Sequence, residues 1–159
     1  MYDLELGDES EYEAIPYNRF AYAYDDMMNH VDYGRWVRYI SDLFELYDVK
    51  PRRILDLACG TGSVAIPLAQ HGFEVVGIDR APGMLDVAKR KGERAGVDVE
   101  WAEGDMRDLG IEGEYDAVVC LYDSVNYMLS TAELKMAFDS VSKALRPGGL
   151  FIFDVISER

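Results

Sequence analysis

From residue 51 onward, short apolar runs alternate with longer amphipathic stretches. The apolar runs have the length of strands and are rich in Val, Ile and Leu, which is typical of strands buried on both faces. Five strands are predicted, at 53–58, 73–78, 97–101, 115–121 and 150–156. The stretches between them predict helices that begin at Ser63, Pro82 and Ser130. Strands alternating with helices predict an α/β fold with a parallel sheet covered by helices on both faces.

Local signals set the ends of these helices. The helix that begins at Ser63 is expected to end near Gln70, and the one that begins at Pro82 is expected to end near Arg94, before Gly96. Ser130 and Glu133 have the spacing of a capping box. The helix after them is predicted to bury Leu134, Phe138, Val141 and Leu145.

An aromatic-rich segment precedes the first strand. Asp32 predicts the start of a helix that ends before Lys50 and Pro51. Its apolar face is predicted to comprise Trp36, Ile40, Leu43, Phe44 and Tyr47. We expect a mobile acidic N-terminus at 1–16, a helical cap region at 17–50 and an α/β core at 51–159, with 17–50 and the core forming one domain.

Composition narrows the classes of partner. The chain has 159 residues, 16 Lys and Arg against 30 Asp and Glu, and a formal net charge of −14. A nucleic-acid partner is not expected, because phosphates need clustered basic residues. No apolar run reaches the roughly 20 residues of a membrane helix, so no membrane partner is expected. Cys59 and Cys120 have no metal-ligand spacing, which predicts buried thiols, no metal site and a cytoplasmic protein.

The run from Leu55 to Gly62 places a glycine turn after the first strand. Such a turn lets backbone N–H groups and a helix N-terminus approach a ligand closely. Gly60, Gly62 and Ala65 also fit the dinucleotide pattern GxGxxA, although glycines at a strand-to-helix turn are often purely structural. Asp56 lies inside the strand, where a buried carboxylate needs donors such as an ammonium group or ordered water.

Two further acidic residues follow the second and third strands. Asp79 can accept hydrogen bonds from both hydroxyls of a ribose, or it can cap the next helix. Asp105 can accept a hydrogen bond from an exocyclic amine, and Met84 and Met106 can sandwich a flat ring. The alternative is a loop aspartate beside two core methionines.

Taken in order, these segments resemble the motifs of class I S-adenosylmethionine-dependent methyltransferases of the small-molecule type. The resemblance rests on DLACGTG at 56–62, GIDRAPGML at 77–85, GDM at 104–106 and LRPGG at 145–149. The run FAYAYD at 20–25, with Tyr33 and Trp36, resembles the N-terminal cap of the sugar and glycine N-methyltransferases. The resemblance implies a Rossmann-like, doubly wound sheet with S-adenosyl-L-methionine as cofactor.

The resemblance also implies roles for single residues. Asp56, Ala58 and Gly60 would face the methionine part of the cofactor, Asp79 the ribose hydroxyls and Asp105 the adenine amine. Met84 and Met106 would flank the adenine, and Cys120 and Leu121 would lie near the sulfonium. Tyr24 and Trp36 would close the pocket from above, with plain core packing as the alternative.

Methyl transfer to an activated carbon depends chiefly on alignment in a dry site. A base is needed only where the nucleophile carries a proton at neutral pH. No residue stands out as that base, and Tyr122, Asp123 and His30 are weak candidates. The segment LYDSVNY at 121–127 differs from the Asn/Asp-Pro-Pro-aromatic motif of nucleic-acid methyltransferases, so a small-molecule acceptor with a nitrogen or oxygen nucleophile is expected.

The family's sheet usually has seven strands, and the last of these have no counterpart before Arg159. The fifth strand is therefore expected to form an exposed edge, where a homo-oligomer is possible. Two other functions stay open at this point. One is an NAD-dependent oxidoreductase, which the glycine pattern and Asp79 favour; the other is a truncated cofactor-binding or assembly module without turnover.

Overall fold

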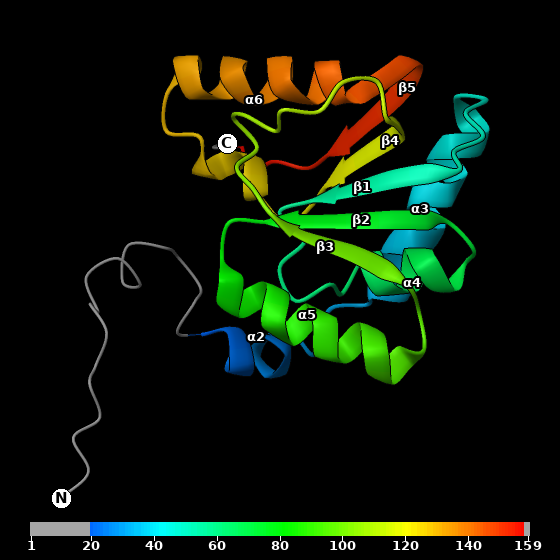
Figure 1. Ribbon diagram of the computed structural model, residues 1–159, viewed down its shortest axis with the longest axis vertical. Helices are drawn as coiled ribbons and strands as arrows, with labels where there is room; N and C mark the ends of the chain where they lie inside the picture. Colours follow the sequence, from blue (N-terminus) through cyan, green and yellow to red (C-terminus); the bar gives the residue numbers. More distant parts are fainter. Residues whose placement is uncertain (1–19, 158–159) are drawn as a thin grey trace, which may run out of the picture.

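The computed structural model describes residues 20–157 and contains one five-stranded sheet (Figure 1). All neighbouring strands are parallel, in the order β3-β2-β1-β4-β5. The strands are β1 Arg53–Leu57, β2 Glu74–Asp79, β3 Val99–Glu103, β4 Tyr115–Cys120 and β5 Leu145–Phe153. The chain moves outward from β1 to β3 and then returns to β4. The switch point therefore lies between β1 and β4, where the carboxyl ends of parallel strands form a ligand crevice.

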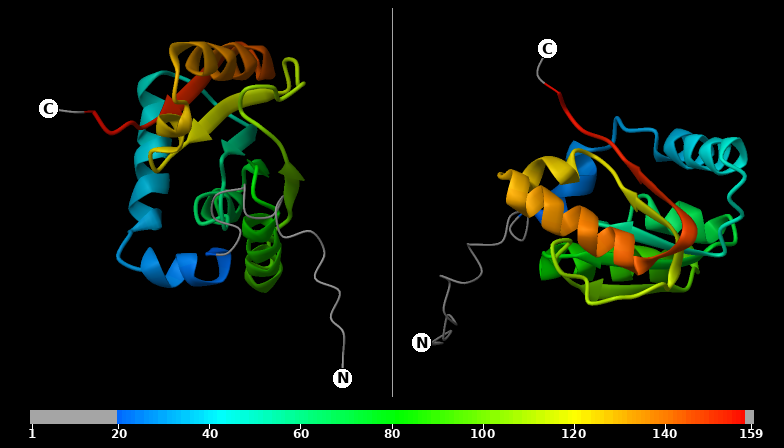
Figure 2. Two further views of the ribbon diagram at one scale, coloured as in Figure 1. Left: turned by 90° about the vertical axis from the view of Figure 1, so that its left-hand side faces the viewer. Right: turned by 90° about the horizontal axis from the view of Figure 1, so that it is seen from above.

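Helices cover both faces of the sheet, as Figure 2 shows from two sides. They are α2 Ala21–Met27, α3 Tyr33–Leu46, α4 Ala65–Gln70, α5 Pro82–Ala95, α6 Thr131–Ala144 and the short 3-10 helix η1 Ser124–Tyr127. One core cluster joins α3 and α4 to the sheet through residues such as Ile40, Leu68 and Ile54. A second cluster on the opposite face joins α6 through Ala137 and Val141. The predicted doubly wound α/β fold is confirmed.

Most element boundaries follow the predictions closely, but β3 and β5 do not. The third strand was expected at 97–101 and lies at Val99–Glu103, because Val97 still belongs to the turn that closes α5, where its N–H bonds to the carbonyl of Gly92. The fifth strand begins at Leu145 and contains an irregularity opposite Tyr115 and Ala117, where Gly148 has a positive φ. The predicted turn at 147–149 is therefore a bulge within a longer strand. The expected N-terminus at 1–16 and the first residues of the cap region, 17–19, lie outside the described residues.

The buried faces of two helices differ from the predicted ones. In α3, Val37 is buried with Ile40 and Phe44, while Tyr47 lies beyond the last turn and is exposed. In α6, small residues make the close contact with the sheet: Ala137, Ser140, Val141 and Ala144 are buried. The prediction for Phe138 is wrong, because the helix packs so closely that its ring lies at the margin, half-exposed beside Phe151 and Phe153. Leu145 belongs to β5 and not to α6.

The capping box at the start of α6 forms with one change. The Ser130 hydroxyl accepts a hydrogen bond from the N–H of Glu133 at 3.1 Å. The Glu133 carboxylate reaches past the cap and accepts from the N–H of Leu129 at 3.0 Å. Both side chains therefore fix the loop that leads into α6.

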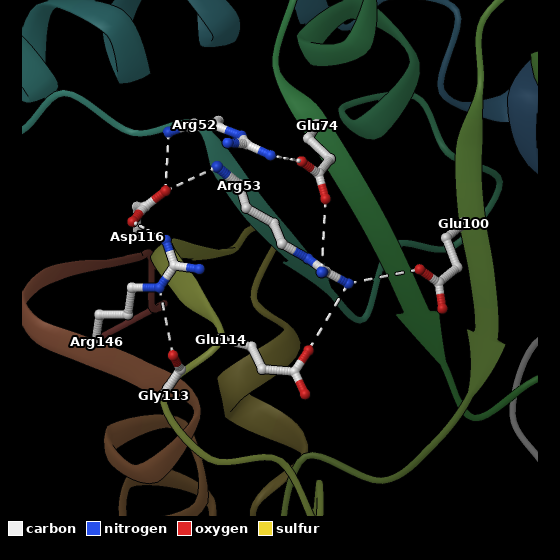
Figure 3. A network of polar contacts seen from close by, with 8 residues as sticks. All are labelled: Arg52, Arg53, Glu74, Glu100, Gly113, Glu114, Asp116 and Arg146. Atoms are coloured by element: carbon white, nitrogen blue, oxygen red, sulfur yellow. Dashed lines mark hydrogen bonds and ion pairs between the residues drawn. The ribbon is translucent and has the colours of Figure 1, made fainter.

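A polar network holds the amino ends of the strands together (Figure 3). Asp116 Oδ2 accepts hydrogen bonds from the backbone N–H groups of Arg52 and Arg53 at 2.9 and 2.8 Å, and its Oδ1 accepts from Arg146 at 2.8 Å. The Arg53 guanidinium lies among three carboxylates, those of Glu74, Glu100 and Glu114. These contacts join all five strands at the edge opposite the crevice.

Replacing Asp116 with alanine should lower the free energy of unfolding by about 1–3 kcal/mol, because two backbone donors at the start of β1 lose their acceptor. Urea denaturation measures the loss. Glu114→Ala serves as the control, since it removes a half-exposed ion pair worth roughly 0–1 kcal/mol. Equal losses of unfolding free energy in the two variants would show that the backbone hydrogen bonds to Asp116 stabilise the fold no more than a half-exposed ion pair does.

Candidate functional site

The glycine turn after β1 uses its two glycines for different reasons. Ala58, Gly60 and Gly62 all have positive φ, at 57°, 54° and 77°. A Cβ at Gly60 would meet nothing within 4 Å, so Gly60 leaves open space beside a left-handed backbone. A Cβ at Gly62 would lie 2.6 Å from Cη2 of Trp101. Gly60 therefore faces free space, whereas Gly62 makes room for an indole ring in the core.

Asp79 connects the end of β2 to this turn. Its Oδ2 accepts a hydrogen bond from the N–H of Gly60 at 2.8 Å, and its Oδ1 accepts from the N–H of Ala81 at 2.9 Å. Burial raises the pKa of this carboxyl, and the backbone donors oppose the shift. Ala81 is the residue that precedes α5, so Asp79 shapes the entry to the helix without being its cap. Each oxygen keeps lone pairs for a further donor.

Asp56 is the most deeply buried carboxyl group of the site. It is 3% exposed, and its Oδ2 has no hydrogen-bond partner among the described residues. Burial raises its pKa to about 8, and the negative charge of Asp79 adds to the effect. Asp56 is therefore mostly protonated at neutral pH, and a cation placed beside it would favour the ionised form.

A cavity lies at the carboxyl ends of β1, β2 and β4. Most of the predicted site residues line it, namely Tyr24, Asp56, Ala58, Gly60, Asp79, Met84, Met106, Leu121 and Tyr122. These residues come from five separate parts of the sequence. The fold brings them together at the switch point between β1 and β4.

Two arginines bind the carboxylate of Asp105. Its carboxylate accepts from Arg107 Nε at 3.0 Å and also from Arg107 Nη2, and Arg80 Nε lies 3.4 Å from Oδ2. The hydrogen bonds from Arg107 lower the pKa of Asp105. Arg107 Nη1 also lies 2.7 Å from Glu133 Oε1, and this ion pair links the segment after β3 to the start of α6. Asp105 lies beside the lining residues Gly104 and Met106 without lining the cavity itself.

Four other predicted residues also lie outside the cavity lining. Trp36 packs edge-on against Tyr122, with ring centroids 5.7 Å apart, so it supports the wall from behind. Cys120 is fully buried beneath Leu121. His30 is exposed after α2, and Asp123 follows Tyr122 in the loop after β4.

The loop after β4 is strained. Tyr122 and Asp123 are consecutive non-glycine residues with positive φ, at 58° and 59°. Such conformations cost energy and cluster at functional sites. The N–H of Asp123 donates to Asp154 Oδ2 at 3.3 Å, and the other oxygen of Asp154 is buried with no hydrogen-bond partner in residues 20–157. Partial burial and the neighbouring Asp154 raise the pKa of Asp123.

Sequence reasoning missed several polar residues at this site. Tyr33, Thr61 and Ser63 line the cavity. Asp25 and Lys91 lie outside the lining: the Thr61 hydroxyl donates to Asp25, and Lys91 donates to the Ser63 hydroxyl. Thr61 and Ser63 belong to the recognised glycine turn, so their position was a usable signal. No local pattern relates Asp25 to Lys91, because 66 positions and two strands separate them.

Residues 20–157 contain no group of three or more His, Cys, Asp or Glu side chains arranged to hold a metal ion. This part of the chain also contains no helix with the length and apolar character needed to span a membrane.

Comparison with known proteins gives consistent findings. Residues 54–149 match a family model described as a methyltransferase domain. The chain is 41% identical over 142 residues to the putative methyltransferase YqeM of Bacillus subtilis, covering 89% of this chain and 56% of that relative. The chain thus spans little more than half the length of this curated relative.

Solved structures agree with this result. A crystal structure of an S-adenosylmethionine-dependent methyltransferase from Clostridium acetobutylicum superimposes with a TM-score of 0.78 at 34% identity, covering 89% of this chain and 58% of that one. CalS10 from Micromonospora echinaspora, an amino pentose methyltransferase solved with S-adenosylmethionine bound, gives a TM-score of 0.74 at 28% identity. That match covers 86% of this chain and 56% of CalS10.

Proposed function

Because this chain belongs to the methyltransferase domain family, we propose that it binds S-adenosyl-L-methionine and transfers the methyl group to a nitrogen or oxygen of a small molecule. The observation that carries the proposal is the cavity itself. Three features line this cavity at the switch point of the sheet: Asp56, the left-handed turn at Gly60, and Asp79. Each carboxylate oxygen of Asp79 accepts one backbone hydrogen bond.

The residues present fit this cofactor. The orphaned oxygen of Asp56 suits an ammonium group of the methionine part, beside Ala58 and Gly60. The carboxylate of Asp79 has lone pairs for the ribose hydroxyls. Met84 and Met106 would flank the adenine.

We propose further contacts between the cofactor and residues at the margin of the cavity. Asp105 would reach the adenine amine only by sharing its carboxylate with Arg107 and Arg80. Leu121 would lie near the sulfonium, with Cys120 behind it. Tyr24 would close the cavity, and Trp36 would act through its contact with Tyr122.

The bound cofactor supplies a methyl group already activated by a positively charged sulfur. The chain's own contribution is then to orient the acceptor and to exclude water. Tyr122 is suited to orientation, because its ring is fixed between Tyr33 and Trp36, at 5.3 and 5.7 Å between ring centroids. Asp123 and His30 remain weak candidates for a base, and neither lines the cavity.

We further propose that the protein is cytoplasmic, that its methyl acceptor is a small molecule and that it has no nucleic-acid partner. The net charge of −14 and the two free, buried cysteines support this proposal. A homo-oligomer through β5 is also proposed, because β5 is an edge strand of the sheet in the described residues and Phe153, its final residue, is 41% exposed.

Isothermal titration with S-adenosylhomocysteine and with NAD tests the proposed cofactor. We expect binding of S-adenosylhomocysteine, and binding of NAD alone would overturn the proposal.

Asp79→Asn should weaken S-adenosylhomocysteine binding by about 1–3 kcal/mol, since one charge-assisted acceptor is lost. Asp86→Asn, at an exposed position on α5, is the matched control and should bind like the wild type. Equal affinity of the Asp79 and Asp86 variants would remove Asp79 from the ribose site.

A further inference from the structure

Helix α2 forms part of the wall of the cavity through Tyr24. It is seven residues long and has no side-chain cap. Helices of this length are not stable alone in water, so its position depends on tertiary contacts. Among the described residues, Ala21 is fully buried in a cluster with Ala81 and Met84, and Tyr24 and Val87 pack at its margin. Figure 1 shows α2 lying beside α5.

One side chain of α2 makes polar contacts to two other elements. Asp25 Oδ1 accepts a hydrogen bond from the Thr61 hydroxyl at 2.6 Å, and Asp25 Oδ2 lies 2.7 Å from the ammonium of Lys91. Lys91 also donates to the Ser63 hydroxyl at 2.9 Å. Thr61 and Ser63 belong to the glycine turn, and Lys91 belongs to α5. Asp25 therefore joins α2 to both the turn and α5.

The burial of these groups sets the strength of the link. Thr61 is 1% exposed, while the side chains of Asp25 and Lys91 are 36% and 28% exposed. Such a pair is screened by solvent and salt more than a fully buried pair, so it breaks and forms again at modest cost.

The link lies beside the cavity. Thr61, Ser63 and Tyr24 all line it, and Tyr24 precedes Asp25 on the helix. Ala81 and Met84, which receive α2, line it as well. Movement of α2 away from α5 would therefore remove Tyr24 from the cavity wall and release the hydroxyl of Thr61.

We propose that Asp25, Lys91, Thr61 and Ser63 form a latch that holds α2 closed over the cofactor, so that cofactor exchange requires the Asp25–Lys91 contact to break. Asp25 is thus a positioning residue that acts through α2 and the glycine turn. This inference rests on the proposed binding of S-adenosylmethionine in the same cavity.

Stopped-flow displacement of S-adenosylhomocysteine tests the latch. Asp25→Asn and Lys91→Met should each release the ligand about five- to tenfold faster than the wild type, as expected for loss of one partly exposed ion pair with its hydrogen bonds. Release from the wild type should accelerate with added salt, and release from Asp25→Asn should respond much less. Asp26→Asn is the matched control, because it makes the same change at the next, exposed position of α2.

Amide hydrogen exchange without ligand gives an independent readout. Residues 21–27 should exchange faster in Asp25→Asn than in Asp26→Asn, while β1 and β4 exchange alike in both, which shows that the core is intact. Equal release rates and equal exchange in the two variants would overturn the latch. If the wild type fails to bind S-adenosylhomocysteine at all, the proposed function fails, whereas faster exchange of α2 would still support the contact.

Discussion

Replacing Gly77 with alanine is expected to destabilise the protein by about 1–3 kcal/mol or somewhat more, the range for overpacking a core. A Cβ at Gly77 would lie 2.6 Å from two carbons of the Trp101 indole and 3.0 Å from Cys59 Sγ. The indole has little room to move away, because its other edges meet Gly62 and Gly92. Urea denaturation measures the loss.

The same clash should reach the site. Trp101 pairs with Gly77 across β2 and β3 and also contacts the glycine turn at Gly62. A displaced indole would therefore shift the turn, and we expect weaker S-adenosylhomocysteine binding in Gly77→Ala as well.

Two controls make this prediction specific. Gly34→Ala, near the start of α3, would place a Cβ no closer than 3.4 Å to another residue. It should stabilise the protein by at most roughly 0.5–1 kcal/mol, so the same chemical change has the opposite sign. Combining Gly77→Ala with Trp101→Leu should cost less than the sum of the two single changes, because the smaller side chain relieves the clash. Additive losses would show that the indole does not set the requirement for glycine.

The second large effect concerns pH and Asp56. Burial raises the pKa of this carboxyl to about 8, so it is mostly protonated at neutral pH. A cationic ligand binds beside the ionised form, so binding below about pH 8 requires the carboxyl to lose its proton. We expect the affinity for S-adenosylhomocysteine to rise with pH by up to about tenfold per unit below pH 8 and to level off above it. Asp56→Asn should bind more weakly and should lose this dependence. Calorimetry between about pH 6 and pH 9 measures both effects, and a flat profile in the wild type would remove Asp56 from the ammonium site.

The stability of the unliganded protein should show the reverse trend. The unfolded chain ionises Asp56 near its ordinary pKa of 3.8, whereas the folded chain holds the proton up to about pH 8. The free energy of unfolding should therefore fall as pH rises from about 4 to 8, with a slope of up to about 1.4 kcal/mol per unit from this group. Asp79, whose pKa is also raised, adds a slope of the same sign, so Asp56→Asn should show a shallower fall and not a flat line.

The position of the cavity follows from the sequence because strand order and site location are coupled. Once Asp56, Gly60 and Asp79 were placed at the ends of two neighbouring parallel strands, the carboxyl edge was the place where they meet. The apolar runs that carry this inference are those of β1, β2 and β4, which are buried along most of their length.

Roles that depend on distant partners did not follow from the sequence. Asp105 stands at the predicted place after β3, but Arg107 and Arg80 occupy its carboxylate. Gly62 and Gly77 looked like ligand-facing glycines or plain strand positions, and only the fold shows that both accommodate Trp101. Side-chain packing between strands leaves no periodic trace in either segment.

The sequence by itself determined the parallel sheet, the glycine turn and the set of acidic residues at the strand ends, because these depend on local periodicity and backbone conformation. Only the tertiary structure decided the partners of the carboxylates. Asp56 keeps one oxygen without a hydrogen bond among the described residues, Asp105 pairs with Arg107, and Asp25 of α2 pairs with Lys91 of α5. The physical reason is that burial and ion pairing are set by neighbours far along the chain, and those neighbours are chosen by how the helices pack on the sheet.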